Sequence, residues 1–452
     1  MAHLLVIENW YGGIGHRFLR RIHDLGHRFT FVSRELAPNW RRVPADGSHP
    51  LFAAENILTA ETNDLPTLLE FLKRQHDIVH FDGVTTACDY YLKHVAHVAE
   101  HLGLPGPGAT GEETARLKHK MRQALDRGGL PNPVFRITRT WDETCAAACE
   151  IGYPLVFKPS DEGGSMFVTL VANEIELRQA FDRLAAYTVN LRGQPRESIF
   201  LLEEYLRGEE ISVEAVGYLG EIHVLGITDK SVTGAPGFIE DGHMFPAATD
   251  PSVAAQARQL VRDALVAVGY THGVSHTEVK LTPDGPRIVE INPRTPGNSI
   301  SDLVRMVTGV DLLDTVIELA AGREPPITMQ DTGIKSAAVK LLLAPRSGNV
   351  SEVRGVEVVS EIPNVVDLTL KPLVGTYVQR PEMNAYLGHV VVVDRMAGGA
   401  RTQAEWAAGQ IKLIYADETG DCRPETEGAT PTDLQADAVV LQQRAETVEA
   451  AS

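Results

Sequence analysis

The sequence contains little cysteine and no long apolar run. Its four cysteines, at positions 88, 145, 149 and 422, form no CxxC pair, so neither a zinc site nor a redox pair of the usual spacing is indicated. Cys145 and Cys149 are expected to be small buried hydrophobic residues. The N-terminal stretch MAHLLVIENWYGG lacks the basic start of a secretory signal, and no segment approaches the roughly 20 apolar residues of a membrane span. We therefore expect a cytoplasmic protein with no membrane partner.

Positive charge is also scarce. Lys and Arg number 42 against 60 Asp and Glu, which gives a net charge of -18. Such a balance disfavours nucleic acid and anionic membranes as partners. A small polyanion such as ATP can still bind at a site where a few lysines, arginines or a divalent metal make the local potential positive despite the net negative charge. The 452 residues, 43% hydrophobic and 23% charged, have the composition of a soluble globular protein with roughly two to four subdomains.

The N-terminal part of the chain alternates short apolar strands with amphipathic helices. Strands are predicted at 3–7, 28–33 and 77–83, and helices at 15–26, 64–75 and 89–103. This alternation predicts a parallel sheet of βαβ units, here a Rossmann-like domain over residues 1–109. The first turn, ENWYGGIGHRF, has Phe18 where a dinucleotide fingerprint has its third glycine, and Glu8 would oppose a pyrophosphate. A plain strand-to-helix turn is therefore favoured over NAD(P) binding.

Beyond a linker marked by Pro105 and Pro107, the pattern changes to α+β. The unit from 110 to 330 is predicted to contain strands at 154–160, 167–171, 199–206, 210–219 and 221–228, with a helix at 174–187. A smaller strand-rich α+β unit, 331–416, is predicted to have strands at 337–344, 366–373 and 389–396 and a closing helix at 402–415. The acidic tail, 417–452, has little to bury and is expected to be loosely held. The fold class expected is α/β plus α+β.

A polar pair interrupts an apolar hairpin in HTEVKLTPDGPRIVEINPR. The TPDGP segment predicts a turn, and a hairpin centred on Asp284 places Leu281 opposite Arg287 and Glu278 opposite Glu290. Period two then puts Ile288, Glu290 and Asn292 on one face and Val289 with Ile291 on the other. Two facing glutamates repel unless a cation lies between them. Two carboxylates and an amide suit Mg²⁺, although an exposed hairpin with solvated glutamates remains the alternative.

Two further segments carry phosphate-binding and nucleotide-binding residue types. YPLVFKPSDEGGSMFV places Lys158 at the end of an apolar strand and follows it with Gly163, Gly164 and Ser165. Glycines there let backbone N–H groups approach phosphate oxygens, although the loop has no Walker A lysine. LLEEYLRGEEISVEAV ends an apolar strand at Glu203 and Glu204. Alone, that segment is typical of a charged surface turn.

Together, in this order and spacing, these motifs resemble the ATP-grasp superfamily, most specifically from about residue 110 to 300. The resemblance implies a Rossmann-like domain followed by a two-lobed ATP-grasp domain, with a nucleotide-binding lobe at about 110–200 and a catalytic lobe at about 201–330. It implies that Lys118 (with Lys120 as the alternative), Lys158 and the Gly163, Gly164 and Ser165 loop bind phosphates. It assigns adenine to Glu203 and the backbone of Glu204, Tyr205 and Leu206, the ribose to Glu210, and the metal to Glu278, Glu290 and Asn292. Arg294 would neutralise the transferred phosphoryl group or a substrate carboxylate.

The segments TDKSVTGAPGFIEDGHMFPA and NPRTPGNSISDL resemble the L-amino-acid ligase branch of this superfamily, whose members join carboxylates to amines. The likeness places Glu240 and His243 at the acceptor site, with Arg294, Gly297 and Asn298 closing its other side. Asn298 stands where many relatives have a second glycine, which bears on the substrate pocket. A loop histidine satisfied by its neighbours is the alternative interpretation of His243.

The function expected is an ATP-dependent carboxylate–amine ligase that works through an acyl phosphate and uses ATP with Mg²⁺, for which Mn²⁺ can substitute. Its partners would be a small-molecule carboxylate and an amine, one of them an amino acid, and a homodimer is expected from the resemblance. Three alternatives remain open: a carboxylase-type ATP-grasp enzyme acting on bicarbonate, a nucleotide-binding scaffold without turnover, and a nicotinamide oxidoreductase. The oxidoreductase is disfavoured by the broken glycine fingerprint.

Overall fold

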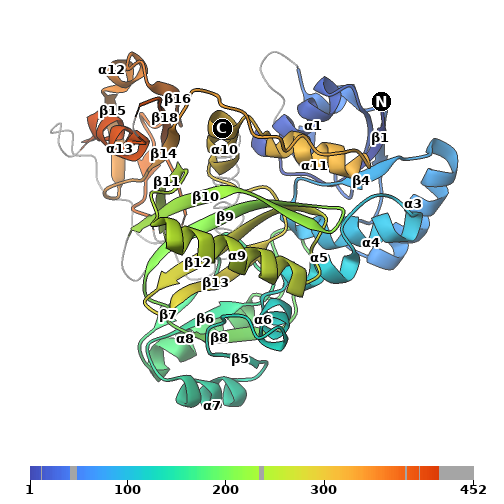
Figure 1. Cartoon of the computed structure of the whole chain (residues 1–452), viewed down its shortest axis with the longest axis horizontal. Helices are drawn as coiled ribbons and strands as arrows, with labels where there is room; N and C mark the ends of the chain where they lie inside the picture. The colour runs from blue at the N-terminus through green and yellow to red at the C-terminus, as the bar shows by residue number, and fades with distance from the viewer. Residues whose placement is uncertain (12, 41–47, 234–238, 382–383, 397, 417–452) are drawn as a thin grey trace.

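The computed structural model describes residues 1–416 except 12, 41–47, 234–238, 382–383 and 397 (Figure 1). The N-terminal unit is a parallel sheet in the order β3-β2-β1-β4. Its elements are β1 (His3–Ile7), α1 (Gly13–Asp24), β2 (Arg28–Ser33), α2 (Ala37–Trp40), η1 (Pro50–Ala53), β3 (Asn56–Thr59), α3 (Leu65–Val79), β4 (Gly83–Thr85), η2 (Asp89–Tyr91) and α4 (Leu92–Leu102). The predicted strand at 77–83 is wrong. Helix α3 continues through Val79 and ends at a left-handed His80, and the strand begins only at Gly83.

An antiparallel sheet in the order β5-β8-β6-β7 follows. Its segment comprises α5 (Ala109–Arg116), α6 (Lys118–Arg127), β5 (Phe135–Thr138), α7 (Trp141–Ile151), β6 (Leu155–Pro159), β7 (Thr169–Val171), α8 (Glu174–Ala186) and β8 (Phe200–Glu204). Apolar residues of α7 and α8 pack on these strands in one core. Cys149 on α7 is exposed and Cys145 is half-buried, so the expectation that both are buried was wrong.

The largest sheet has eight strands in the order β13-β12-β9-β10-β11-β14-β18-β16. Its elements and those around it are β9 (Glu209–Tyr218), β10 (Glu221–Thr233), β11 (Ile239–Phe245), α9 (Pro251–Ala267), β12 (Gly273–Thr282), β13 (Gly285–Asn292), α10 (Ile300–Thr308), α11 (Leu312–Ala320), β14 (Ser336–Leu342), β15 (Gly348–Arg354), α12 (Val356–Ser360), β16 (Val365–Leu370), β17 (Tyr377–Val378), β18 (Gly388–Asp394), α13 (Ala400–Gln410) and β19 (Lys412–Tyr415). The predicted helix at 402–415 is wrong past Gln410, because the last residues pair with β15 as β19.

The sheet runs across residue 330, where the sequence predicts a domain boundary, because β14 pairs with β11. Helix α11 in turn packs against the N-terminal sheet (Figure 1), where Leu313 and Ile317 share a core with Leu4 and Phe29. The division into domains at 110 and 331 stays a prediction. None of the helices in the described part of the chain has the length and apolar character needed to cross a bilayer.

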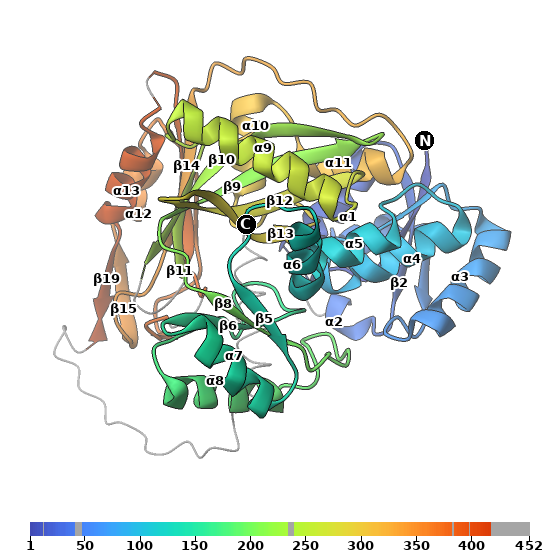
Figure 2. The ribbon, with the colours of Figure 1, turned by 60° about the horizontal axis from the view of Figure 1, so that its bottom comes forward.

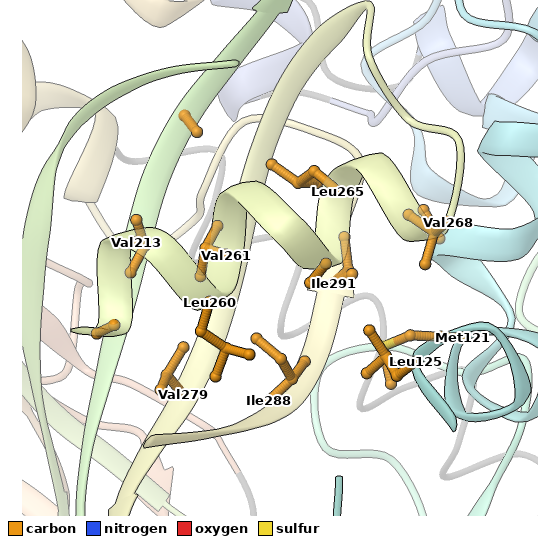
Figure 3. Packing of buried hydrophobic residues seen from close by; sticks show 14 of the residues in the cluster. Met121, Leu125, Val213, Leu260, Val261, Leu265, Val268, Val279, Ile288 and Ile291 are labelled. Atoms are coloured by element: carbon orange, nitrogen blue, oxygen red, sulfur yellow. The ribbon is translucent and has the colours of Figure 1, made fainter. Parts of the chain in front are cut away.

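Two sheets face each other around the candidate site. In Figure 2 the antiparallel sheet β5-β8-β6-β7 (the lower sheet) lies below strands β12 and β13 of the eight-stranded sheet (the upper sheet). Helix α9 covers the outer side of the upper sheet, and α7 and α8 cover the outer side of the lower one. The buried residues of α9 recur at helical spacing and include Leu260, Val261 and Leu265. Figure 3 shows them packed against Ile288 and Ile291 of β13. Each such side chain contributes about 1.5–3 kcal/mol by burial, so α9 fixes which face of the hairpin is apolar.

Candidate active site

The hairpin β12–β13 brings the two predicted metal-binding glutamates face to face. At its turn Thr282 pairs with Gly285 and Lys280 with Arg287, one residue away from the predicted register. A β-bulge between Glu278 and Val279 then shifts the register, and Glu278 pairs with Glu290. The predicted facing of these two carboxylates is confirmed, although the register predicted at the turn is wrong. Bulges of this kind are common beside active sites, where they re-aim a side chain.

The bulge leaves Val289 without a register partner on β12 and breaks the period of two. Ile288 and Ile291 consequently both enter the core under α9 (Figure 3). The prediction that Ile288 shares a face with Glu290 is therefore wrong. Asn292 does lie beside Glu290, since its Nδ2 donates to Glu290 Oε1 at 2.9 Å.

Arg122 on α6 supports the bulge, a role that the sequence analysis missed. Its Nη1 and Nη2 donate to the carbonyl oxygens of Ile288 and Val289, both at 2.8 Å. Its Nε and Nη2 also hold both oxygens of Glu203, at 2.7 and 3.0 Å. The side chain is fully buried. Arg122 thus ties β8 of the lower sheet to β13 of the upper one.

The two predicted phosphate-binding lysines both pair with site glutamates. Lys118 Nζ lies 2.8 Å from Glu290 Oε2, and Lys158 Nζ lies 2.7 Å from Glu203 Oε2. Burial alone would raise the pKa of Glu290, but Lys118 outweighs it and holds that pKa well below its usual range. Burial lowers the pKa of Lys158, and the charge of Glu203 offsets this only in part. Lys120, the alternative to Lys118, pairs instead with Glu113 at 2.6 Å.

The Glu203 carboxylate, assigned to adenine by the resemblance, is engaged with Arg122 and Lys158. Burial would raise the pKa of Glu203, yet these two cations lower it to about 2. Glu204 donates its backbone N–H to the Val134 carbonyl at 2.9 Å. Tyr205 and Leu206 follow the end of β8 and are half-buried.

The glycine loop after β6 has a buried acidic anchor and an exposed tip. Tyr90 Oη donates to Glu162 Oε2 at 2.8 Å, and Lys118 Nζ donates to the Glu162 carbonyl at 2.7 Å. Gly164 and Ser165 are exposed, with φ of 60° and 59°, and Gly163 is half-buried. A Cβ at either glycine would meet nothing within 4 Å. The loop therefore has open space at the position where the sequence predicts phosphate contact.

A buried lysine that sequence reasoning missed links three predicted site residues. Lys230 Nζ lies 3.0 Å from Glu210 Oε1, 2.9 Å from Glu240 Oε1 and 2.6 Å from Glu278 Oε1. Glu210 also contacts Lys280 at 3.0 Å. The residues assigned to the ribose, the acceptor and the metal thus meet at one ammonium group.

The predicted acceptor residues also converge. Asn298 Nδ2 donates to Glu240 Oε2 and, at 3.3 Å, to Tyr386 Oη. His243 is buried, with Nε2 3.5 Å from Glu240 Oε2. Tyr386 lies beyond the predicted boundary at 331, so the C-terminal part of the chain helps to form this wall. The left-handed Asn298, with φ of 50°, tolerates a backbone conformation that usually favours glycine.

Arg294 lies at the other side of the same turn and meets the N-terminal unit. Its Nε contacts Asp89 Oδ2 at 2.5 Å, and its Nη1 donates to the Thr295 carbonyl at 2.9 Å. Gly297 is exposed, and its carbonyl accepts from Ile300 N at 3.0 Å. Asp89 is a further residue that the sequence analysis missed.

The donor set fits a hard divalent cation. Within the described ranges, no three His, Cys, Asp or Glu side chains are arranged as a complete metal cage. Mg²⁺, however, is commonly held by one or two protein carboxylates and completed by substrate phosphates and water. Glu278 and Glu290, facing each other with the Asn292 amide beside them, supply oxygen ligands of that kind.

Three family models match the chain in succession. Residues 21–106 match the ATP-grasp N-terminal domain, 151–302 the ATP-grasp domain, and 340–416 the L-amino acid ligase C-terminal domain 2. An uncharacterised protein of Sinorhizobium fredii, y4rH, is 30% identical over 362 residues, which cover 79% of this chain and 74% of that one. The chain belongs to the ATP-grasp superfamily, and its C-terminal part matches a domain of L-amino acid ligases.

The chain is also similar to two named ligases and to one solved structure. Alanine–anticapsin ligase of Bacillus amyloliquefaciens is 30% identical over 301 residues, 62% of each chain. Carnosine synthase 1 of Gallus gallus is 33% identical over 271 residues, 56% of this chain and 28% of that one. The crystal structure of an L-amino acid ligase from Bacillus licheniformis superposes with a TM-score of 0.74 at 22% identity, covering 92% of this chain and 99% of that one. The ATP-grasp fold predicted from the sequence is confirmed.

Proposed function

We propose that the protein is an ATP-dependent carboxylate–amine ligase that forms an amide or peptide bond, with an amino acid as one substrate. The observation that carries the proposal is the pairing of Glu278 with Glu290 across the bulged hairpin, beside Lys118. Two facing carboxylates flanked by phosphate-binding lysines suit MgATP, and the matched L-amino acid ligase C-terminal domain 2 supports an amino-acid substrate. ATP and Mg²⁺ are the cofactors, and Mn²⁺ can take the place of Mg²⁺.

The reaction has two balanced steps. An oxygen of the substrate carboxylate attacks the γ-phosphorus, ADP leaves, and an acyl phosphate forms. The amine nitrogen then attacks the acyl carbon, the phosphate leaves with the carboxylate oxygen, and the nitrogen loses a proton. A bound Mg²⁺ supplies charge neutralisation on the phosphates.

The chain's own residues would mainly position the reactants. Lys118 and Lys158 exchange their glutamate partners for phosphate oxygens, and Arg294 neutralises the reacting phosphoryl group or carboxylate. The Gly163–Ser165 loop closes over the phosphates to exclude water, which would otherwise hydrolyse the acyl phosphate. Glu240, His243 and Asn298 line the amine side. The enzyme is further proposed to be cytoplasmic and homodimeric.

A phosphate-release screen over pairs of amino acids and amines, with mass spectrometry of the products, tests the proposal. Wild-type protein should release phosphate only when both substrates are present and should form the condensed product. Glu290→Gln should reduce that release at least about 100-fold, because it removes one of the two carboxylates among the proposed metal ligands, worth several kcal/mol of charge stabilisation in the transition state. The matched control is Glu221→Gln, whose side chain is 81% exposed on β10.

Two outcomes would contradict the proposal. A fully active Glu290→Gln enzyme would exclude the metal role of Glu290. Phosphate release that needs bicarbonate alone would instead identify a carboxylase-type enzyme; the biotin carboxylase domain of Hydrogenobacter thermophilus 2-oxoglutarate carboxylase shares the fold at a TM-score of 0.65 and 20% identity.

A further inference from the structure

Lys230 occupies a central place in the catalytic sheet. It lies on β10 between β9 and β11, with Glu210 and His243 as its register partners. Its side chain is only 2% exposed, and its ammonium nitrogen lies within 3.0 Å of carboxylate oxygens of Glu210, Glu240 and Glu278. A lysine in the middle of a buried strand is costly unless it is paired.

The ammonium group is saturated by this arrangement. A lysine has three N–H donors and no acceptor, and three carboxylates lie within hydrogen-bond distance of it. Burial lowers the pKa of Lys230, but the three glutamates outweigh it and hold that pKa well above the usual range. In this arrangement the three donors of the ammonium group are matched by three acceptors.

The three carboxylates belong to different parts of the proposed reaction. Glu278 is the proposed metal ligand and Glu210 the proposed ribose contact, both on the nucleotide side. Glu240 lies on the acceptor side, where it also accepts from Asn298. Among the described residues that contact Lys230, these glutamates connect the nucleotide side with the acceptor side. A ligand bound on one side can therefore affect the other side through them.

We propose that Lys230 is a positioning residue that couples the nucleotide side of the site to the acceptor side. The inference rests on the proposed function, because it takes Glu278 as a metal ligand and Glu240 as an acceptor residue. One ammonium charge is shared among three carboxylates. A change in the negative charge of Glu240 shifts the Lys230 ammonium group toward or away from Glu278. This shift changes how strongly Glu278 attracts a divalent cation.

Mn²⁺ binding tests this coupling without any turnover. Free Mn²⁺ is followed by electron paramagnetic resonance at saturating ADP for the wild type, Glu240→Gln, Lys230→Met and the double variant. Glu240→Gln should weaken Mn²⁺ binding at least fivefold although it removes no proposed metal ligand. The reason is that the Lys230 ammonium group then interacts more strongly with Glu278. Lys230→Met should tighten Mn²⁺. In that background, adding Glu240→Gln should change Mn²⁺ affinity less than twofold.

Matched controls separate coupling from general electrostatics. Lys280→Met removes a lysine that also contacts Glu210, at 3.0 Å, but that forms no ion pair with Glu240 or Glu278 in the described part of the chain. The fivefold effect of Glu240→Gln should persist in the Lys280→Met background. Asp241→Asn removes the neighbouring negative charge, which pairs with Lys340 at 2.8 Å, and should change Mn²⁺ affinity less than twofold. This comparison needs no Lys230 variant, so it decides the matter even if Lys230→Met does not fold.

The outcomes distinguish the inference from the function on which it rests. Equal effects of Glu240→Gln in the wild-type and Lys230→Met backgrounds, or equal effects of Glu240→Gln and Asp241→Asn, would overturn the coupling and leave the ligase proposal standing. Wild-type protein that fails to bind Mn²⁺ would overturn the metal assignment and the coupling together. Coupling without product formation in the phosphate-release screen would uphold this inference and count against the ligase.

Discussion

Replacement of Arg122 by methionine should both destabilise the protein and disturb the nucleotide side of the site. Arg122 is fully buried and makes contacts of 2.7 to 3.0 Å with both oxygens of Glu203 and with the carbonyls of Ile288 and Val289. Methionine keeps much of the apolar volume but supplies none of these donors. The perturbation therefore isolates the polar role of the side chain.

The expected magnitude follows from what is left behind. Breaking a buried ion pair by removal of one partner costs about 3–5 kcal/mol, because the remaining charge stays buried. Lys158, 2.7 Å from Glu203, still offsets part of that charge. The two carbonyls at the bulge lose their donor, at about 1–3 kcal/mol for each buried unsatisfied group. These terms are not additive, so we expect a net loss of about 3 kcal/mol or more.

Urea unfolding at pH 7, together with calorimetric titration of MgADP, measures both effects. Arg122→Met should lower the urea concentration at the unfolding midpoint and weaken MgADP binding at least tenfold, since the positions of Lys158 and Glu290 both depend on the elements that Arg122 joins. Arg122→Lys keeps the positive charge but loses the planar guanidinium group with its several donors. Its unfolding midpoint and MgADP affinity should lie between those of the wild type and Arg122→Met. The control, Arg136→Met, removes an exposed pair with Glu150 at 2.7 Å, which typically contributes about 0–1 kcal/mol.

The pH dependence gives an independent check. The pKa of Glu203 is lowered in the folded protein to about 2, so its contribution to stability is present above the unfolded value of about 4.3 and is lost as pH falls from there towards 2. Arg122→Met should flatten the acid limb of the stability curve in that window. If Arg122→Met is no more destabilising than Arg136→Met, or leaves the acid limb unchanged, the structural argument for Arg122 fails.

Local patterns in the sequence were enough to predict several geometric features of the candidate site. Lys158 stands at the end of an apolar strand, and the glycines after it mark a loop, so both are readable from a few neighbouring residues. The facing of Glu278 and Glu290 followed from one turn signal and a period of two. That success had an accidental element, because the assumed hairpin centre was one residue off and the bulge at Val289 compensated for it.

The missed residues depend on contacts distant in sequence. Arg122 meets Glu203 and Ile288, which lie 81 and 166 positions further along the chain, and its own helix shows only ordinary amphipathic spacing. The stretch GITDKSV around Lys230 is mixed in polarity and gave no clear signal, and the role of Lys230 depends on Glu278 across the sheet. Such roles come from tertiary pairing, which strand and helix patterns do not encode.

Two further substitutions test the surroundings of the site. Tyr90→Phe removes the hydrogen bond from Tyr90 Oη to Glu162 at 2.8 Å. It should raise the KM for ATP a few-fold, since such a bond contributes about 0.5–1.5 kcal/mol, and more with a charged acceptor. The control is Tyr91→Phe, because the Tyr91 hydroxyl donates to Asn63 instead; equal KM values for the two variants would refute the anchoring role of Tyr90. Glu112 is buried, its Oε1 has no partner in the described structure, and burial raises its pKa to about 8. Folding therefore favours the protonated acid, and the stability it contributes is lost as pH rises from about 4.3 through 8. Glu112→Gln should thus stabilise the protein at pH 9, by roughly 5 kcal/mol at most at 1.36 kcal/mol per pKa unit, and change its stability little at pH 4, as measured by urea unfolding beside Glu221→Gln. An equal effect at both pH values would show that Glu112 is not held neutral by burial.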